Sequence, residues 1–147
     1  MIEIIYDVST LEGSCYIEIL PDKYKGDCWS SSSIFFSEDN FSYIMPIFEK
    51  CFGKFDYYAF NEIDIETWKS IIKELQKMKD CLSNNPKPNS LKAVIGFPFI
   101  YSEEEFMGKF TENYDKNIQQ LITMITEFQN WIEAKIPSTK VISVLGM

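Results

Sequence analysis

The chain has 147 residues, of which 46% are hydrophobic and 16% aromatic, and its formal net charge is −8. A chain of this length fits one domain, residues 1–147, and buries roughly two thirds of its unfolded surface, which excludes intrinsic disorder. Histidine and arginine are both absent. Their absence removes the commonest general base and metal ligand, and the preferred residue for bidentate phosphate recognition. We therefore expect a binding protein and not an enzyme, with no cofactor and no metal.

The ends and the apolar runs of the sequence predict a cytoplasmic location. The longest apolar runs, such as residues 93–101, are far shorter than the ~20 residues of a membrane span. Residues 1–7 carry acids and lack the basic start of a signal peptide. The four cysteines have spacings that match no metal or redox motif, so in a reducing compartment we expect them to be small buried side chains: Cys15, Cys28, Cys51 and Cys81.

Strand patterns come first along the chain. Apolar residues alternate with polar ones over residues 2–8 and again over residues 15–19, which together predict an antiparallel hairpin. Residues 55–60 are rich in aromatics and predict another strand, and the β-branched residues 141–145 predict a strand inside the sheet. Residues 91–97 fit either a short strand or an irregular apolar plug.

Helix starts are marked by capping residues. Ser37, Asp64 and Ser102 each stand between two large apolar residues, one directly before the cap and one four positions after it. The second of these starts opens an amphipathic pattern over residues 65–82. The third opens a pattern that reaches Pro137 and would span ~52 Å as one straight helix. A domain of this size has a radius of gyration of only ~15 Å, so we expect a break between Thr111 and Asn117.

Pro46 predicts a further kink or break in the helix after Ser37. The order of these elements predicts an α+β fold, a single-layer and mostly antiparallel sheet with helices packed on one face.

Most features that could carry catalysis have a structural explanation. Acids crowd the helix starts around Asp64 and Ser102, where the helix dipole and free N–H groups stabilise negative charge. The serine run at residues 30–33 and Cys28 offer nucleophiles, yet the chain has no histidine to activate them and no nucleophile motif. The glycines form no phosphate-binding pattern.

Charge is distributed unevenly. Residues 1–70 hold 13 of the 22 acids and 5 of the 14 lysines, so the whole negative excess lies in this half. An acidic surface repels nucleic acid and attracts basic proteins, although the excess also serves solubility. Tyr57 and Tyr58 are adjacent, so one of them would face away from the core of a strand. We predict a partner-binding surface formed by Asp22, Asp27, Glu38, Asp39, Asp56, Tyr57, Glu62, Asp64 and Glu66.

Several segments resemble the immunity proteins of bacterial polymorphic-toxin and contact-dependent growth-inhibition systems. They are the opening hairpin, the helix entry Phe35-Phe36-Ser37-Glu38-Asp39-x-Phe41, the helix with Ile63, Trp68, Ile71 and Ile72, and the terminal strand Val141-Ile142-Ser143-Val144-Leu145-Gly146. Many such proteins are small, acidic, cytosolic α/β domains without enzymatic motifs. The resemblance implies that the chain binds a cognate toxin domain, commonly a nuclease, and covers its basic active-site surface.

Two other functions remain open from the sequence. An acidic adaptor or regulatory domain with a non-toxin partner would show the same surface charge. A small-molecule site built from carboxylates and tyrosines would require a ligand pocket, and the lack of histidine makes it the weakest of the three.

Overall fold

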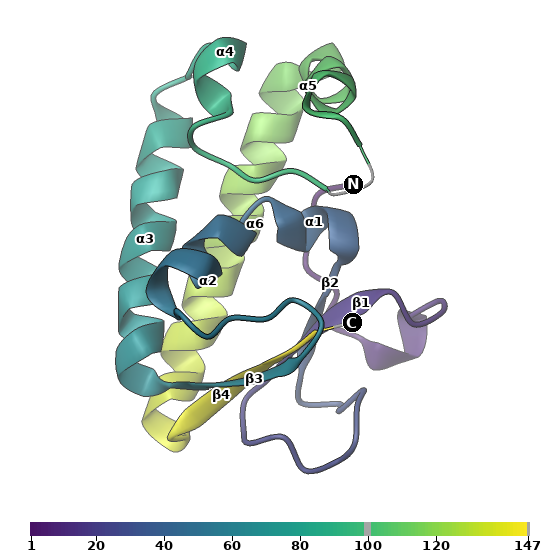
Figure 1. Cartoon of the computed structure of the whole chain (residues 1–147), viewed down its shortest axis with the longest axis vertical. Helices are drawn as coiled ribbons and strands as arrows, with labels where there is room; N and C mark the ends of the chain where they lie inside the picture. Colours follow the sequence, from purple (N-terminus) through teal and green to yellow (C-terminus); the bar gives the residue numbers. More distant parts are fainter. Residues whose placement is uncertain (99–100, 147) are drawn as a thin grey trace.

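A four-stranded antiparallel sheet with the strand order β2-β1-β4-β3 forms the lower part of the molecule (Figure 1). The computed structural model describes residues 1–98 and 101–146. One face of the sheet carries the helices, and the predicted α+β fold is confirmed. The strands are β1 (Tyr16–Leu20), β2 (Ile34–Ser37), β3 (Phe60–Asp64) and β4 (Val141–Leu145).

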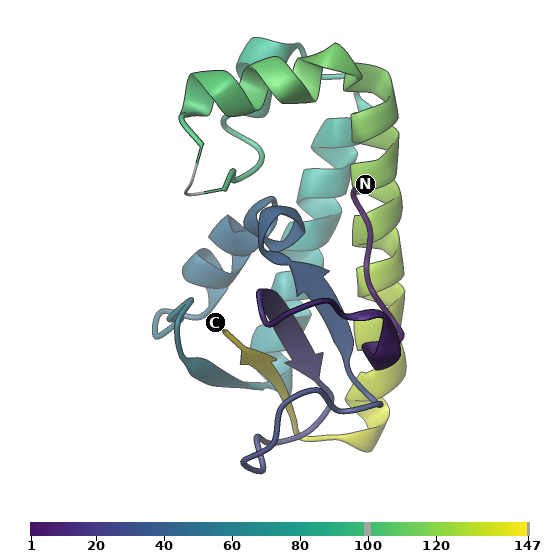
Figure 2. The same ribbon diagram turned by 90° about the vertical axis from the view of Figure 1, so that its right-hand side faces the viewer.

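The core lies between the sheet and two long helices, α3 (Ile65–Ser83) and α6 (Tyr114–Lys135), which run side by side (Figures 1 and 2). Alternate strand residues, such as Ile17 and Ile19, join this core because successive side chains of a strand point to opposite faces. Trp68 of α3 is fully buried. Its indole N–H donates to the Ile142 carbonyl over 3.0 Å, which fixes α3 onto β4.

The three predicted helix caps are confirmed. The side chains of Ser37, Asp64 and Ser102 each accept a hydrogen bond from the backbone N–H three residues later. They open α1 (Glu38–Ser42), α3 and α5 (Glu103–Glu112). Both predicted breaks are also present. Pro46 lies in the first turn of α2 (Met45–Cys51), and α5 and α6 are separated at Asn113.

The upper part of the molecule holds α4 (Pro88–Leu91) and α5, away from the sheet (Figure 1). The segment that begins at Leu91, the last residue of α4, is the irregular apolar plug and not a strand, and Leu91 and Ile95 are buried in it. Gly96 makes the closest approach of this plug to α1 and α2. Its N–H donates to the Tyr43 carbonyl, and an added Cβ would lie 2.2 Å from the Ser42 carbonyl oxygen.

The predicted N-terminal hairpin is wrong. Residues 2–5 run along β2, where Ile5 and Phe35 exchange two backbone hydrogen bonds of 2.8 Å, and β1 pairs with β2 and β4 instead. The alternation in this segment is real, since Ile2 and Ile4 are buried. A period of two shows which side chains are buried, but it does not show which strand is the neighbour. A short 3₁₀ helix, η1 (Val8–Thr10), follows this segment.

Two further expectations need correction. The strand predicted at residues 55–60 lies at Phe60–Asp64, because residues 52–59 form turns closed by the bonds Phe55 N–H to Phe52 O and Ala59 N–H to Asp56 O. The cysteines are not buried: Cys51 is partly exposed, and the other three are exposed.

A pair of glycines tests the packing of the plug. We expect Gly96→Ala to lower the free energy of unfolding by about 1–3 kcal/mol, because its Cβ would meet backbone that cannot move aside. Gly108→Ala, in the α5 helix with nothing within 4 Å of the added Cβ, should raise it by about 0.5–1 kcal/mol through helix propensity. Urea unfolding of both variants measures the difference, and equal effects would contradict the packing argument.

Candidate functional site

The predicted partner-binding residues separate into groups at the two ends of the sheet. Strands of five residues are about 13 Å long, so side chains at opposite ends of a strand do not touch. Ser37 ends β2 and Phe60 begins β3 at one end, whereas Asp64 ends β3 beside Val141 at the other. Glu62 lies between the two ends and is exposed.

We call the first group the acidic end: Glu38, Asp39, Asp56, Tyr57, Tyr58 and Phe60. The side chain of Tyr57 lies close to Glu38, so the turn before β3 meets the start of α1. Burial and then the nearby Glu38 charge raise the pKa of Tyr57 well above its ordinary value, so its hydroxyl stays protonated. The three carboxylates make no salt bridge among the described residues.

The aromatic residues of the acidic end differ in exposure. Tyr57, a predicted binding residue, is only 8% exposed, whereas its neighbour Tyr58 is 70% exposed and Phe60 is 48% exposed. Tyr58 and Phe60 therefore carry the aromatic surface that the sequence indicated near Tyr57. An exposed aromatic beside carboxylates is the composition of a protein-binding surface.

The second group, at the far end of the sheet, is already engaged within the chain. Asp22 forms a 2.7 Å salt bridge with Lys25, and the hydrogen bond from Lys25 is the largest cause that lowers the pKa of Asp22. Glu66 forms a 3.0 Å salt bridge with Lys69. Asp64 caps α3 through Thr67, which lowers the pKa of this carboxyl group. These residues contribute less free charge than their number implies.

The face of the sheet opposite the helices, here called the outer face, is covered by the loop of residues 21–33. Glu18 of β1 points to this face and is 1% exposed. Its carboxylate accepts hydrogen bonds from the Trp29 N–H (2.7 Å), the Ser30 N–H (3.0 Å) and the Ser33 hydroxyl (2.6 Å). Ser143 of β4 adds a bond of 2.7 Å to the Asp22 carbonyl.

This loop also places aromatic rings on the outer face. Tyr24 packs on Phe60 with ring centroids 4.2 Å apart, and Trp29 packs between Phe35 and Tyr16. Trp29 has a φ of 66°, a region that a bulky residue adopts only when its surroundings hold it there. The bonds to Glu18 supply that restraint. Asp27 lies in this loop, is exposed, and forms no salt bridge among the described residues.

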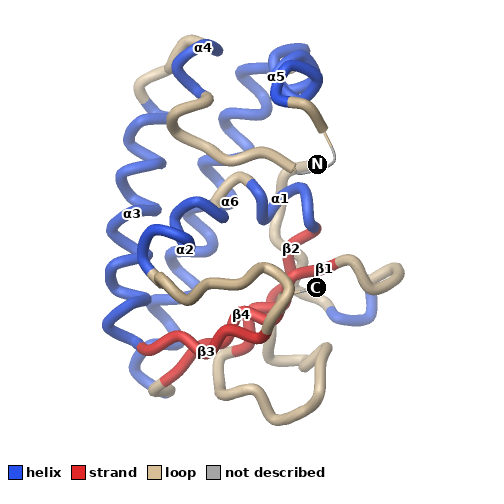
Figure 3. Tube along the Cα trace, viewed as in Figure 1, coloured by secondary structure: helices blue, strands red, loops and turns tan. Residues whose placement is uncertain are grey.

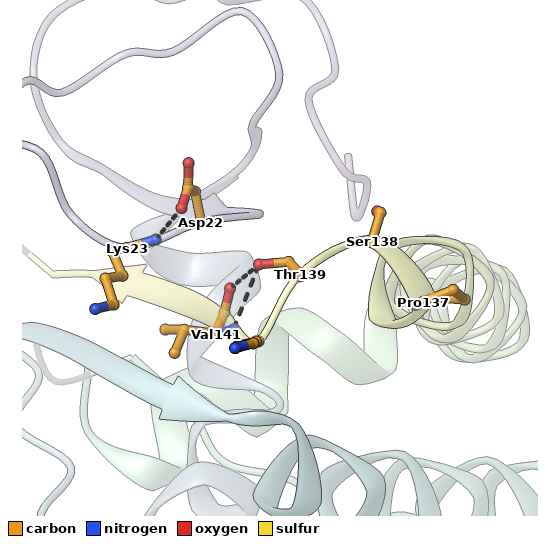
Figure 4. Close-up of a pocket in the computed structure, with 7 residues that line it drawn as sticks. Asp22, Lys23, Pro137, Ser138, Thr139 and Val141 are labelled. Atoms are coloured by element: carbon orange, nitrogen blue, oxygen red, sulfur yellow. Dashed lines mark hydrogen bonds between the residues drawn. The ribbon is translucent and has the colours of Figure 1, made fainter.

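A hollow at the far end of the sheet holds no catalytic arrangement of side chains. It has a volume of about 470 Å³ and is lined by residues 22–23 and 137–141 (Figure 4). Its polar groups bond to one another: Asp22 accepts from the Lys23 N–H, and the Thr139 hydroxyl donates to the Val141 carbonyl. Throughout residues 1–98 and 101–146, no three acidic, cysteine or histidine side chains are placed to hold a metal ion.

Comparison with protein families, with curated proteins and with solved structures finds no match. No helix within the described residues is long and apolar enough to cross a membrane. Any inference about function must therefore come from the arrangement of the surface residues described above. It consists of an acidic end whose carboxylates make no salt bridge among the described residues, the exposed Tyr58 and Phe60, and a loop held by the buried carboxyl group of Glu18.

Sequence reasoning missed Glu18, Phe60 and the covering loop. Glu18 alternates with Ile17 and Ile19, a pattern typical of a solvent-facing acid, and only the return of residues 21–33 buries it. The aromatic pattern predicts that a strand ends at Phe60, whereas β3 begins there. The available signal is the pair of aromatic residues Tyr24 and Trp29 in a loop that is mostly polar.

The role of Glu18 is testable by proteolysis. Glu18→Gln replaces one acceptor oxygen with an NH₂ group that opposes an N–H donor, and should weaken the closed loop by about 2 kcal/mol. We expect trypsin to cleave after Lys23 or Lys25 at least about tenfold faster, because cleavage follows the population of the open loop. Glu12→Gln, at an exposed acid before β1, is the control. Equal cleavage rates in both variants would show that Glu18 does not hold the loop.

Proposed function

We propose that the chain is a cytoplasmic immunity protein that binds and neutralises a cognate toxin domain by covering its basic active-site surface. A nuclease is the toxin class that this surface fits best. The observation that supports the proposal is the acidic end, where Glu38, Asp39 and Asp56 are free of salt bridges among the described residues and lie at the same end of the sheet as exposed Tyr58 and Phe60.

In this proposal, the carboxylates of the acidic end and its exposed aromatic side chains both contribute to inhibition of the toxin. A nuclease cleft is lined by cations that bind the phosphate backbone, and carboxylates compete with phosphate for the same cations. Complementary charge speeds the encounter of the two proteins. Aromatic side chains that become buried on binding slow dissociation, since they contribute most of the energy at the centre of an interface.

An acidic adaptor with a non-toxin partner is the alternative, and it would use the same surface. The two functions differ in the partner. The immobilised protein would be exposed to a lysate of the cell that encodes it, and the retained protein would be purified and assayed for toxicity. A toxin whose activity disappears at a one-to-one ratio supports the proposal, whereas a retained protein without toxic activity supports the adaptor function.

Neutralising the acidic end tests which surface binds that partner. The double variant Asp39→Asn with Asp56→Asn keeps an acceptor for the Tyr58 N–H and removes two charges. We expect its affinity for the retained partner to fall by about five- to tenfold at low salt, with a weaker salt dependence. Titration calorimetry at several salt concentrations measures both.

The matched control is Glu112→Gln with Glu133→Gln, which removes two exposed charges from α5 and α6. This variant should bind like the unchanged protein. If both double variants lose affinity equally, net charge matters and the acidic end is not the binding surface.

A further inference from the structure

The two edges of the sheet are closed differently. Along β2, the N-terminal segment covers the edge through the paired hydrogen bonds of Ile5 and Phe35, and this segment is held in turn by the Ile2 N–H bond to Gln120 of α6 (Figure 2). At the other edge, β3 is the outermost strand (Figure 3). Its register with β4 runs without a bulge from Phe60 to Asp64, and it contains no proline.

The hydrogen-bonding groups on this free edge follow from the register. The Gly146 N–H donates to the Ala59 carbonyl over 2.9 Å, so the residues that bond to β4 are 59, 61 and 63. The N–H and C=O groups of Phe60 and Glu62 then point away from the sheet. Within the described part of the chain, no other segment forms a backbone hydrogen bond with these two residues.

Side chains on the outer face of β3 give this edge a chemical preference. Phe60, Glu62 and Asp64 share that face, since they alternate with the buried Asn61 and Ile63. Two copies of β3 paired edge to edge and centred on Glu62 would place one Glu62 opposite the other, and like charges directly opposite destabilise a sheet. A strand with basic residues at alternate positions would instead find Glu62 and Asp64 opposite them, and an apolar residue would meet Phe60.

We propose that β3 is a docking edge, on which an extended segment of a basic partner protein adds as a fifth strand. The occupying segment carries Lys or Arg opposite Glu62 and Asp64 and an apolar residue opposite Phe60. Backbone bonds to Phe60 and Glu62 provide affinity, and the side chains select the sequence. This inference deepens the proposed function and rests on it for the identity of the partner.

A capped peptide probes the edge directly. The sequence Thr-Lys-Thr-Lys-Thr-Phe-Thr matches an antiparallel addition, and its reverse matches a parallel one. We expect one of them to slow amide hydrogen exchange at Glu62 at least about tenfold in the ¹⁵N-labelled full chain, since exchange reports local bonding. The amides of Asn61 and Ile63, which already face β4, should change far less.

Two matched reagents separate strand addition from simple charge attraction. The antiparallel peptide N-methylated at its lysines and phenylalanine, or the parallel peptide N-methylated at its threonines, keeps its charge but loses the N–H donors that would face β3. Either should bind at least about tenfold more weakly than its unmethylated form. Glu62→Lys should reverse the preference at this position, so that a peptide with Glu in place of only the lysine opposite residue 62 binds this variant better than the original peptide does.

Three results would overturn the proposal. One is equal binding of the methylated and unmethylated peptides. Another is peptide binding that perturbs the amides of Asp39 and Asp56 and leaves Glu62 unprotected. The third is protection of Glu62 that appears without peptide as the protein is concentrated, which would assign the edge to a second copy of the chain.

The peptide experiments test the docking edge, and the partner experiments test the immunity function, so each proposal can fail separately. If the edge does not bind the peptide but the Asp39 and Asp56 double variant still loses the toxin, the acidic end binds alone. If the edge binds the peptide but the retained partner is no toxin, the docking edge stands without the immunity function.

Discussion

The Glu18 carboxylate lies at the centre of β1 with 1% of its surface exposed, and it determines how the outer face of the sheet is closed. The helices cover only the other face, while Phe35, Leu20 and Leu145 on the outer face also need shelter from water. The loop of residues 21–33 covers these side chains. Because it has no regular structure, its backbone N–H groups need other hydrogen-bond acceptors. Glu18 accepts two of them, so a buried charge and an irregular backbone stabilise each other.

The loop of residues 21–33 covers the outer face incompletely, and the candidate surface exists for that reason. It reaches β3 through Tyr24, whose ring lies on Phe60 and still leaves Phe60 48% exposed. Glu62 remains exposed beyond it. The restraint on Trp29 also matters for binding, because a loop that is already ordered loses little conformational entropy when a partner arrives. The stability of the covering loop and the readiness of the surface thus depend on the same carboxylate.

Features that depend on neighbouring residues could be predicted from the sequence, and features that depend on distant segments could not. The caps at Ser37, Asp64 and Ser102 are local. The helix break at Asn113 could be predicted because one straight helix would be too long for a domain of this size. The burial of Glu18 and the partner of residues 2–5 require segments far apart in the chain to meet. The acidic half was predicted as one surface. The spacing of Asp22 from Lys25 and of Glu66 from Lys69, three residues in each case, already indicates that these acids can form salt bridges within the chain.

Size limits what each part of the surface can do. Stable protein complexes bury about 800 Å² on each partner, more than an edge that offers the backbone groups of two residues can supply. The acidic end begins where β3 begins, and Phe60 belongs to both, so a partner that adds a strand to β3 would be carried onto Tyr58 and Asp56. In such a complex, backbone pairing would fix the register, and the carboxylates of the acidic end would hold a basic surface next to it. The edge would therefore supply specificity and the acidic end additional buried area, so the two parts of the surface complement each other.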